Sequence, residues 1–290
     1  MFAALLGRKI SDGSGVTTSS EDLLTSEVFG TFSYLDCLDI PAAFLSKARN
    51  IFGGQFSIEN LSRLRIVFWP TVRYGKSEMR EPDAVLLLDF KDGQKAFALV
   101  EAKYLSGPSN RMFSGESASK DPKDTTSNLD VMLGHQLADE YIAIRQGTWS
   151  TELAKELGEA TRKILLYVTA HHDFPLDDFT AGRDEIIHPA KGVSGLDIEK
   201  DFARDFYWLS WQDLHGILDE QLRADFPNYT PGQKKLLLDL MRALALRNLT
   251  ECRGISPLPP CGDYEEFFDT MLWESTLQVP ETYSTIWHAE

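Results

Sequence analysis

Two carboxylates and one lysine stand at the ends of two neighbouring apolar segments. Asp83 begins the run DAVLLLDF, and Glu101 and Lys103 lie near the end of the run KAFALVEAKY. The Asp-Gly pair at 92–93 separates the two runs and is typical of the turn of a β-hairpin. The two carboxylates are therefore expected on adjacent strands, at the end of the hairpin away from its turn.

The turn decides whether the carboxylates share a face of the sheet. A two-residue type I′ turn puts Asp83 on the opposite face from Glu101. A three-residue loop over 91–93, with Gly93 in the left-handed region as a G1 bulge, sets Asp83 directly across from Glu101. In that second register the two Cβ atoms are roughly 5 Å apart, and Lys103 shares the face of Glu101.

Two carboxylates placed directly opposite each other destabilise a fold unless a cation lies between them. Mg²⁺ or Mn²⁺, which prefer oxygen ligands, suit that position. Phosphodiester hydrolysis needs such an arrangement, because the metal polarises the phosphoryl oxygen and supplies hydroxide while a lysine orients the attacking water or offsets developing charge. Asp83, Glu101 and Lys103 therefore predict a metal-dependent hydrolytic centre.

The same residues resemble a known signature. Pro82-Asp83, an apolar strand and Glu101-Ala102-Lys103 look like the PD-(D/E)XK motif of restriction-endonuclease-like nucleases, with 17 residues between the Asp and the Glu. The resemblance implies that Asp83 and Glu101 bind metal, that the carbonyl of Ala102 adds a ligand, and that Lys103 is catalytic. An isolated Glu-x-Lys is more often a surface ion pair, and the preceding apolar strand and Pro-Asp are what favour the catalytic interpretation.

Many members of this superfamily place a Glu on the helix before the sheet. Glu21 shares the inward face of a predicted helix with Leu24 and Val28, whereas Glu27 lies off that line. We therefore expect Glu21 to join the catalytic and metal-binding residues. A role at the helix N-terminus, in a capping box with Thr18, explains Glu21 equally well.

Many members also place a Gln on the helix after the Glu-x-Lys strand. Gln136 falls on an apolar stripe with Met132, Leu133 and Tyr141, and the resemblance implies a catalytic role for it. In one exonuclease-like branch the motif is QxxxY, but four residues separate Gln136 from Tyr141 here, so membership of that branch is in doubt. A buried amide bonded to the backbone is the alternative.

The surrounding periodicity predicts an α/β fold. Its mixed central sheet, flanked by helices, is expected to form a restriction-endonuclease-like core with a helical C-terminal extension. We expect a nuclease-like domain over residues 1–225 and a helical, acidic extension over 226–290, packed on the same domain or on a partner. The predicted helices cover residues 19–35, 41–51, 129–147, 152–160, 213–222 and 232–248, and the predicted strands cover 64–74 (interrupted at Pro70), 83–90, 95–104, 163–171 and 206–211.

Composition limits the setting of this chemistry. Among 290 residues, 44 acidic and 29 basic side chains give a formal net charge of −15, so no general polyanion-binding surface is visible in the totals. Residues 251–290 hold eight acidic residues and one basic residue, and the rest of the chain is only mildly acidic. The three cysteines form no CxxC pair, and no apolar run is long enough for a membrane helix, so we expect a cytoplasmic protein.

DNA is the expected substrate, in bacterial or phage DNA processing, defence or repair. The acidic C-terminal region, which also carries many aromatic residues, is expected to contact protein, as a homodimer or with a separate partner. The alternative function is a binding or scaffold protein that kept a nuclease-like fold. His171 and His172 are interpreted as solvated loop residues. The basic residues expected to contact phosphate are Arg63, Arg65, Arg73, Lys76, Arg80, Arg111, Lys120 and Lys123.

Overall fold

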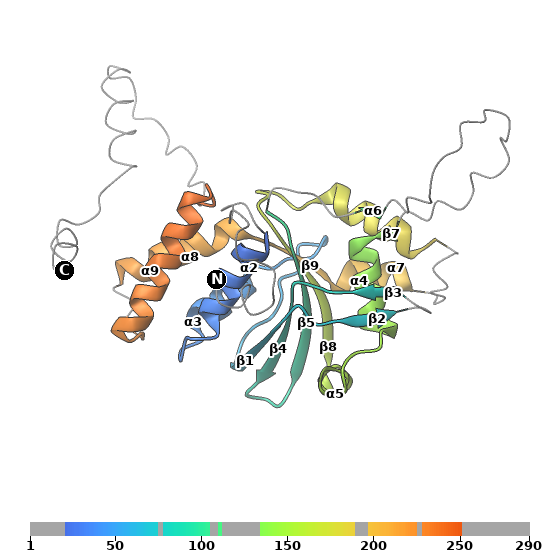
Figure 1. The fold of residues 1–290 in the computed structure, drawn as a ribbon, viewed down its shortest axis with the longest axis horizontal. Coiled ribbons are helices and arrows are strands. Elements are labelled where there is room, and N and C mark those ends of the chain that lie inside the picture. Colours follow the sequence, from blue (N-terminus) through green and yellow to red (C-terminus); the bar gives the residue numbers. More distant parts are fainter. Residues whose placement is uncertain are drawn as a thin grey trace, which may run out of the picture. The chain divides into compact units, whose positions relative to one another are not determined.

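A mixed five-stranded sheet forms the centre of the molecule (Figure 1). The computed structural model describes residues 21–74, 78–104, 110–111, 134–188, 197–224 and 228–250. The first three strands in the sheet order pair antiparallel and the last three pair parallel, which confirms the predicted mixed sheet. The strand order is β1 (Leu61–Phe68), β4 (Ala84–Phe90), β5 (Lys95–Ala102), β8 (Arg162–Thr169) and β9 (Phe206–Ser210).

The β4–β5 hairpin has the three-residue loop. Gly93 has φ +83°, its N–H donates to the carbonyl of Phe90 at 3.0 Å, and the Phe90 N–H donates to the carbonyl of Gln94 at 3.0 Å. Pairing then continues outward from Asp89–Lys95 to Ala84–Val100. The G1-bulge register is therefore confirmed, because glycine takes the left-handed conformation without the strain that a Cβ atom brings.

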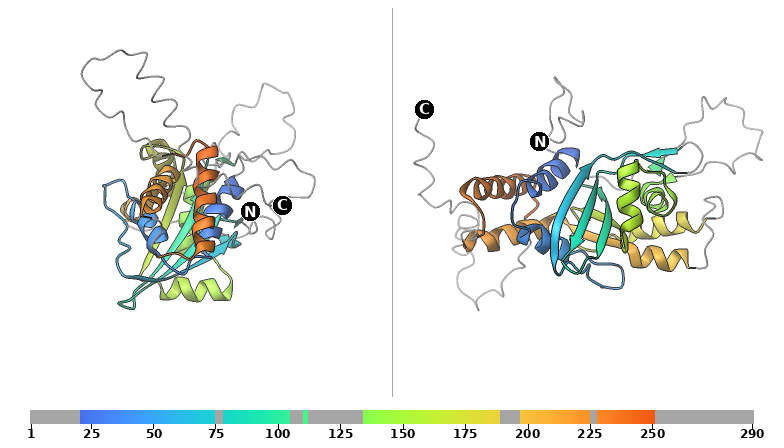
Figure 2. Two further views of the ribbon diagram at one scale, coloured as in Figure 1. Left: turned by 90° about the vertical axis from the view of Figure 1, so that its left-hand side faces the viewer. Right: turned by 90° about the horizontal axis from the view of Figure 1, so that it is seen from below.

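Helices cover both faces of the sheet, which lies between two helical layers (Figure 2). Because side chains alternate along a strand, Leu86 and Val100 pack on one side while Val85 and Leu99 pack on the other. Strands buried on both faces are mainly apolar, as β4 is from Ala84 to Leu88 and β5 is from Ala96 to Val100. One layer holds α2 (Glu21–Phe32), α3 (Asp39–Ser46), α8 (Trp211–Arg223) and α9 (Pro231–Leu246); the other holds α4 (Gln136–Gln146), α5 (Thr151–Glu159), α6 (Leu176–Ile186) and α7 (Ile198–Asp205).

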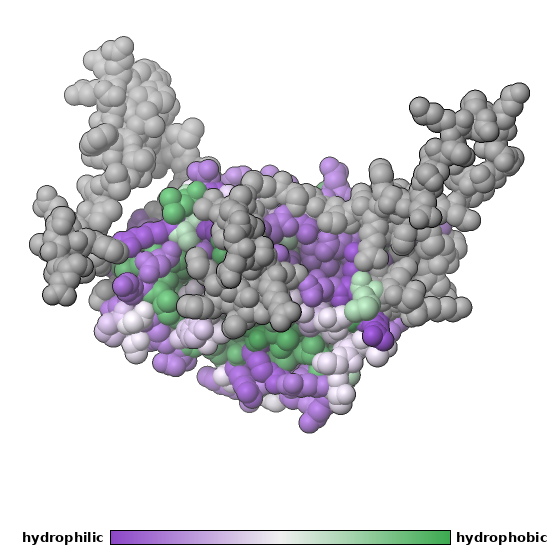
Figure 3. Space-filling model, viewed as in Figure 1, coloured by the Kyte–Doolittle hydropathy of each residue, from purple (hydrophilic) through white to green (hydrophobic). Residues whose placement is uncertain are grey.

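The two edges of the sheet end differently. At one edge, β1 stops before Pro70, and the chain continues as β2 (Val72–Tyr74), which pairs with β3 (Glu78–Arg80) in a separate two-stranded sheet. The strand predicted over 64–74 is thus broken at its proline. At the other edge, Arg49 and Trp208 exchange two backbone hydrogen bonds of 2.9 Å. Figure 3 shows a hydrophobic area where Figure 1 places β1 and β4.

Helix α9 belongs to the core beside α2. Thr230 and Gln233 form a capping box at its start, and Leu237, Leu240 and Leu244 are buried in the same cluster as Leu24 of α2.

Residues 251–290, with the predicted acidic contact region, lie outside the described residues, so the domain limits at 225 and 226 remain predictions. A short pairing of β6 (Asn110–Arg111) with β7 (Gly134–His135) precedes α4. Across the described ranges, no helix is both long and apolar enough to span a membrane.

Candidate active site

Asp83 and Glu101 lie opposite each other at the open end of the hairpin. The strand pairing ends at Ala84–Val100, and Asp83 and Glu101 are the next residues beyond that pair. The charge of Glu101 raises the pKa of Asp83, so the two carboxyl groups are near each other. Their side chains share the face of Val85 and Leu99, which is the face covered by α4. One Asp83 oxygen, Oδ2, accepts a hydrogen bond of 2.8 Å from the N–H of Ala102. The predicted proximity of the two carboxylates is therefore present.

Lys103 follows the end of β5 and joins the strand's carboxylate to helix α2. Its Nζ lies 2.6 Å from Glu101 Oε1 and 3.5 Å from Glu21 Oε2. The lysine backbone is held on both sides, because its N–H donates to the carbonyl of Val168 at 2.8 Å and its carbonyl accepts from the Trp211 indole at 3.1 Å. The ammonium is thus fixed among carboxylates in a site that leaves Lys103 only 7% exposed.

Glu21 reaches this centre from the first turn of α2, and Glu27 does not. Besides meeting Lys103, Glu21 accepts a hydrogen bond of 3.3 Å from the N–H of Tyr104. Glu27 instead forms an ion pair of 2.9 Å with Arg247, just after α9. The choice of Glu21 over Glu27 is confirmed for position, whereas its metal-binding role remains a prediction.

Gln136 and Glu140 bring helix α4 into the cluster. Gln136 begins the helix, and its Nε2 donates to Glu140 Oε1 at 3.2 Å. Glu140 is fully buried, and its carboxyl group adjoins that of Glu101. Sequence reasoning missed Glu140; the available signal was its position four residues after Gln136, on the same helical face.

Burial and mutual repulsion disfavour the charged forms of these carboxyl groups. Burial raises the pKa of Asp83 well above its usual range, and the nearby charge of Glu101 adds to the effect. Burial likewise raises the pKa of Glu101, with a further contribution from Glu140, and burial raises the pKa of Glu140 to about 7. Burial opposes the charge on Lys103, but its pairing with Glu101 outweighs burial and raises the lysine pKa. Such perturbed groups cluster at functional sites.

The donor set has the chemistry of a site for a hard divalent ion. Carboxylate oxygens are the ligands that Mg²⁺ and Mn²⁺ prefer, and Glu140 Oε2 is buried without a hydrogen-bond partner among the described residues. The described ranges contain no group of three His, Cys, Asp or Glu side chains already arranged around one metal position. The Lys103 ammonium lies between Glu101 and Glu21, so ligation requires the side chains to shift.

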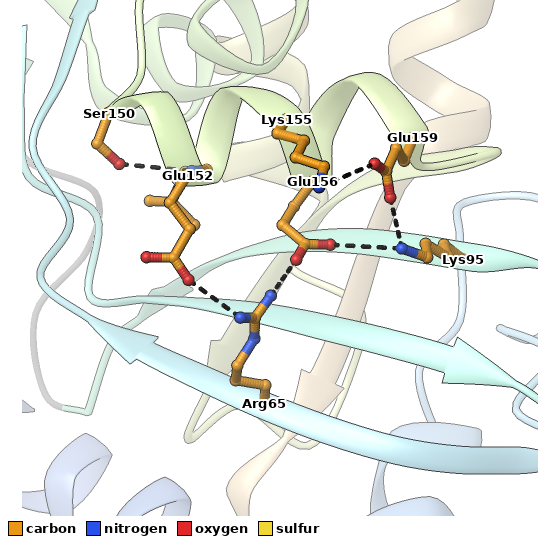
Figure 4. A network of polar contacts seen from close by, with 8 residues as sticks. Arg65, Lys95, Ser150, Glu152, Lys155, Glu156 and Glu159 are labelled. Atoms are coloured by element: carbon orange, nitrogen blue, oxygen red, sulfur yellow. Dashed lines mark hydrogen bonds and ion pairs between the residues drawn. The ribbon is translucent and has the colours of Figure 1, made fainter.

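Two of the arginines expected to contact phosphate are engaged elsewhere. Arg65 pairs with Glu152 and Glu156 of α5 (Figure 4). Arg80 pairs with the buried Asp139 of α4. In this structure Arg65 and Arg80 are therefore not free to bind phosphate, which corrects the prediction for these two residues. Sequence patterns do not reveal such ion pairs.

The structure describes some of the remaining residues that the sequence predicted for the site. Arg63 and Arg73 are exposed, as are the loop histidines at positions 171 and 172. Ala102 lies between Glu101 and Lys103 on the same strand, and its carbonyl ligand role stays a prediction. The positions of Lys76, Lys120 and Lys123, and the side chain of Arg111, lie outside the described residues.

Comparison of the chain with protein-family models, with curated proteins and with solved structures finds no match.

Proposed function

We propose that this protein is a Mg²⁺- or Mn²⁺-dependent nuclease that hydrolyses phosphodiester bonds of DNA. The observation that carries the proposal is the closeness of the Asp83 and Glu101 carboxyl groups, with Lys103 Nζ 2.6 Å from Glu101 Oε1. That geometry agrees with the resemblance of Pro82-Asp83 and Glu101-Ala102-Lys103 to the PD-(D/E)XK signature. Bacterial or phage DNA processing, by restriction, defence against mobile elements or repair, is the setting that the resemblance suggests.

The residues of the candidate site have separate parts in this proposal. Asp83, Glu101 and the Ala102 carbonyl hold the divalent ion, which when bound polarises a phosphoryl oxygen and lowers the pKa of water. Lys103 keeps its proton on Nζ and orients the attacking water or offsets negative charge in the transition state. Glu21 holds the lysine from the side of α2.

The rest of the surface limits how nucleic acid can approach. The chain is acidic overall, so phosphate binding requires a local basic region. Arg63 and Arg73 are exposed basic residues among the described ones. DNA is therefore expected to contact a limited surface near β1 and β2.

A cleavage assay of the full chain tests the proposal. Linear, circular and single-stranded DNA, and RNA, are incubated with Mg²⁺, Mn²⁺ or EDTA. Asp83→Asn keeps an oxygen acceptor for the Ala102 N–H but removes the charge, and Asp89→Asn, at the other end of β4, is the matched control. We expect metal-dependent DNA cleavage that Asp83→Asn loses and Asp89→Asn retains. DNA binding without cleavage in any metal would favour the binding-protein alternative and overturn the nuclease.

A further inference from the structure

Helix α4 contributes a carboxylate whose burial the hairpin motif does not explain. Glu140 has no exposed surface, and an ionised carboxylate away from water is costly unless a cation or several hydrogen bonds compensate it. Glu140 faces the sheet, because its carboxyl group contacts that of Glu101 on β5. A side chain in this place therefore needs a partner inside the protein.

The partners that the structure provides for Glu140 are insufficient. Oε1 accepts one hydrogen bond from the neutral amide of Gln136, at 3.2 Å. Oε2 is buried and has no hydrogen-bond partner among the described residues. The ammonium of Lys103 is paired with Glu101 and Glu21. The carboxyl groups of Glu140 and Glu101 contact each other, and a hydrogen bond between them needs a proton on one of the two. When both groups are ionised, Oε2 of Glu140 has no donor among the described residues.

The position of Glu140 is nevertheless fixed. Its neighbour Asp139 forms a buried ion pair with Arg80 at the end of β3, three residues before Asp83. This pair joins α4 to the segment that leads into the hairpin. Gln136 holds the other oxygen of Glu140 from the preceding turn of the helix. The carboxyl group of Glu140 is consequently held beside that of Glu101, and ligation requires Glu101 to turn from the Lys103 ammonium toward it.

We propose that Glu140 is a further ligand of the divalent ion, binding through Oε2 together with Asp83 and Glu101. Gln136 then acts as a positioning residue, because its hydrogen bond to Oε1 turns the second oxygen toward the ion. This inference rests on the metal site of the proposed function and adds a ligand from a helix. A divalent ion carries two positive charges, so it offsets more of the negative charge of the three carboxylates than the single Lys103 ammonium does.

Metal binding by the full chain tests the assignment without reference to cleavage. Glu140→Gln is nearly isosteric and keeps an oxygen that can accept from Gln136, but it removes the charged ligand. Mn²⁺ affinity is measured by isothermal titration calorimetry, and thermal unfolding is followed in EDTA and in Mn²⁺. Glu152→Gln, on the exposed face of α5, is the control.

We expect Glu140→Gln to weaken Mn²⁺ binding by roughly 10-fold to 100-fold. Removing a group that only supports a metal ligand already weakens metal binding by about that much, so the loss of a ligand should be at least as large. The same variant should unfold at a higher temperature than the wild type in EDTA, because it removes a buried acceptor without a donor, and should gain less from Mn²⁺. Glu152→Gln should match the wild type in Mn²⁺ affinity. Should Glu140→Gln fail to fold, Glu140→Asp keeps the charge on a shorter side chain, and weakened but measurable Mn²⁺ binding is expected.

Unchanged Mn²⁺ affinity in Glu140→Gln, with binding lost in Asp83→Asn, would overturn the assignment and leave Glu140 a structural residue. Metal binding that depends on Glu140, in a protein that cuts no nucleic acid, would support the assignment while removing the nuclease. Absence of Mn²⁺ and Mg²⁺ binding in the wild type would overturn both.

Discussion

Two groups of acidic and basic side chains in this molecule differ in burial and in the balance of their charges. On α5, Glu152, Glu156 and Glu159 meet Arg65 and Lys95 at the partly exposed surface, and each carboxylate has a basic partner (Figure 4). At the open end of the hairpin, buried carboxylates outnumber the single ammonium, and their pKa values are raised. Matched surface charges hold elements together weakly, whereas an unmatched buried cluster must take up protons or a cation, and such clusters are concentrated at functional sites.

The largest effect is expected from Lys103→Ala. Cleavage should fall by at least about 100-fold, because a group that acts in the transition state is removed, while folding and DNA binding are retained. In EDTA the variant should unfold earlier than the wild type, since Glu101 and Glu21 lose their ammonium partner, and Mn²⁺ should restore part of the loss. Single-turnover cleavage and thermal unfolding measure the two effects, and cleavage at the wild-type rate would make the lysine purely structural.

Arg80→Ala should have the largest effect on stability. The ion pair with Asp139 leaves the two side chains 10% and 2% exposed, so removal of the arginine takes a cationic partner away from a buried carboxylate. A loss of about 3–5 kcal/mol in the free energy of unfolding is expected, measured by urea denaturation. Arg80→Lys, which keeps the charge, serves as control. A loss below about 1 kcal/mol would mean that water reaches Asp139.

Glu21→Gln and Glu27→Gln compare two carboxylates of one helix. Glu21 meets Lys103 and the N–H of Tyr104, so its variant should need more metal and cleave roughly 10-fold more slowly. Glu27 pairs with Arg247 away from the site, so its variant should lose stability with little change in cleavage. Metal-titrated cleavage assays distinguish them, and a larger defect in the Glu27 variant would reverse the assignment.

Arg65→Ala represents the surface network and should have the smallest effect. Its side chain is 35% exposed and pairs with partly exposed Glu152 and Glu156, so the loss of unfolding free energy should stay below about 1 kcal/mol. The loss should shrink further at high salt, which screens surface charges. Urea denaturation at low and high salt measures it. A loss as large as that of Arg80→Ala would erase the difference between the two regions.

The hairpin was predictable because its signals are local. The Asp-Gly pair between two apolar, β-prone runs limited the register to two alternatives, and one of these places Asp83 opposite Glu101. The inward stripe of α2 likewise selected Glu21, since helical spacing fixes a face without reference to the rest of the fold.

The partners on other elements were not predictable in the same way. Glu140 joins the site only because α4 packs over β5, and Arg80 is withdrawn from phosphate binding only because Asp139 lies beside it. Both depend on contacts between segments about 40 to 60 residues apart, which propensity and periodicity do not encode. The sequence pattern therefore identified the two strands of the candidate site and placed Gln136 on the helix that follows them, but it did not identify Glu140 on the same helix.

Anomalous diffraction from crystals of the full chain soaked in Mn²⁺ tests the central claim most directly, since it locates the ion among the carboxylates. The account predicts one Mn²⁺ bound by Asp83 and Glu101, with Glu140 Oε2 as a further ligand and the Lys103 ammonium displaced from Glu101. A crystal in which Mn²⁺ is absent from this cluster at saturating concentration, with Lys103 still paired to Glu101, would contradict it.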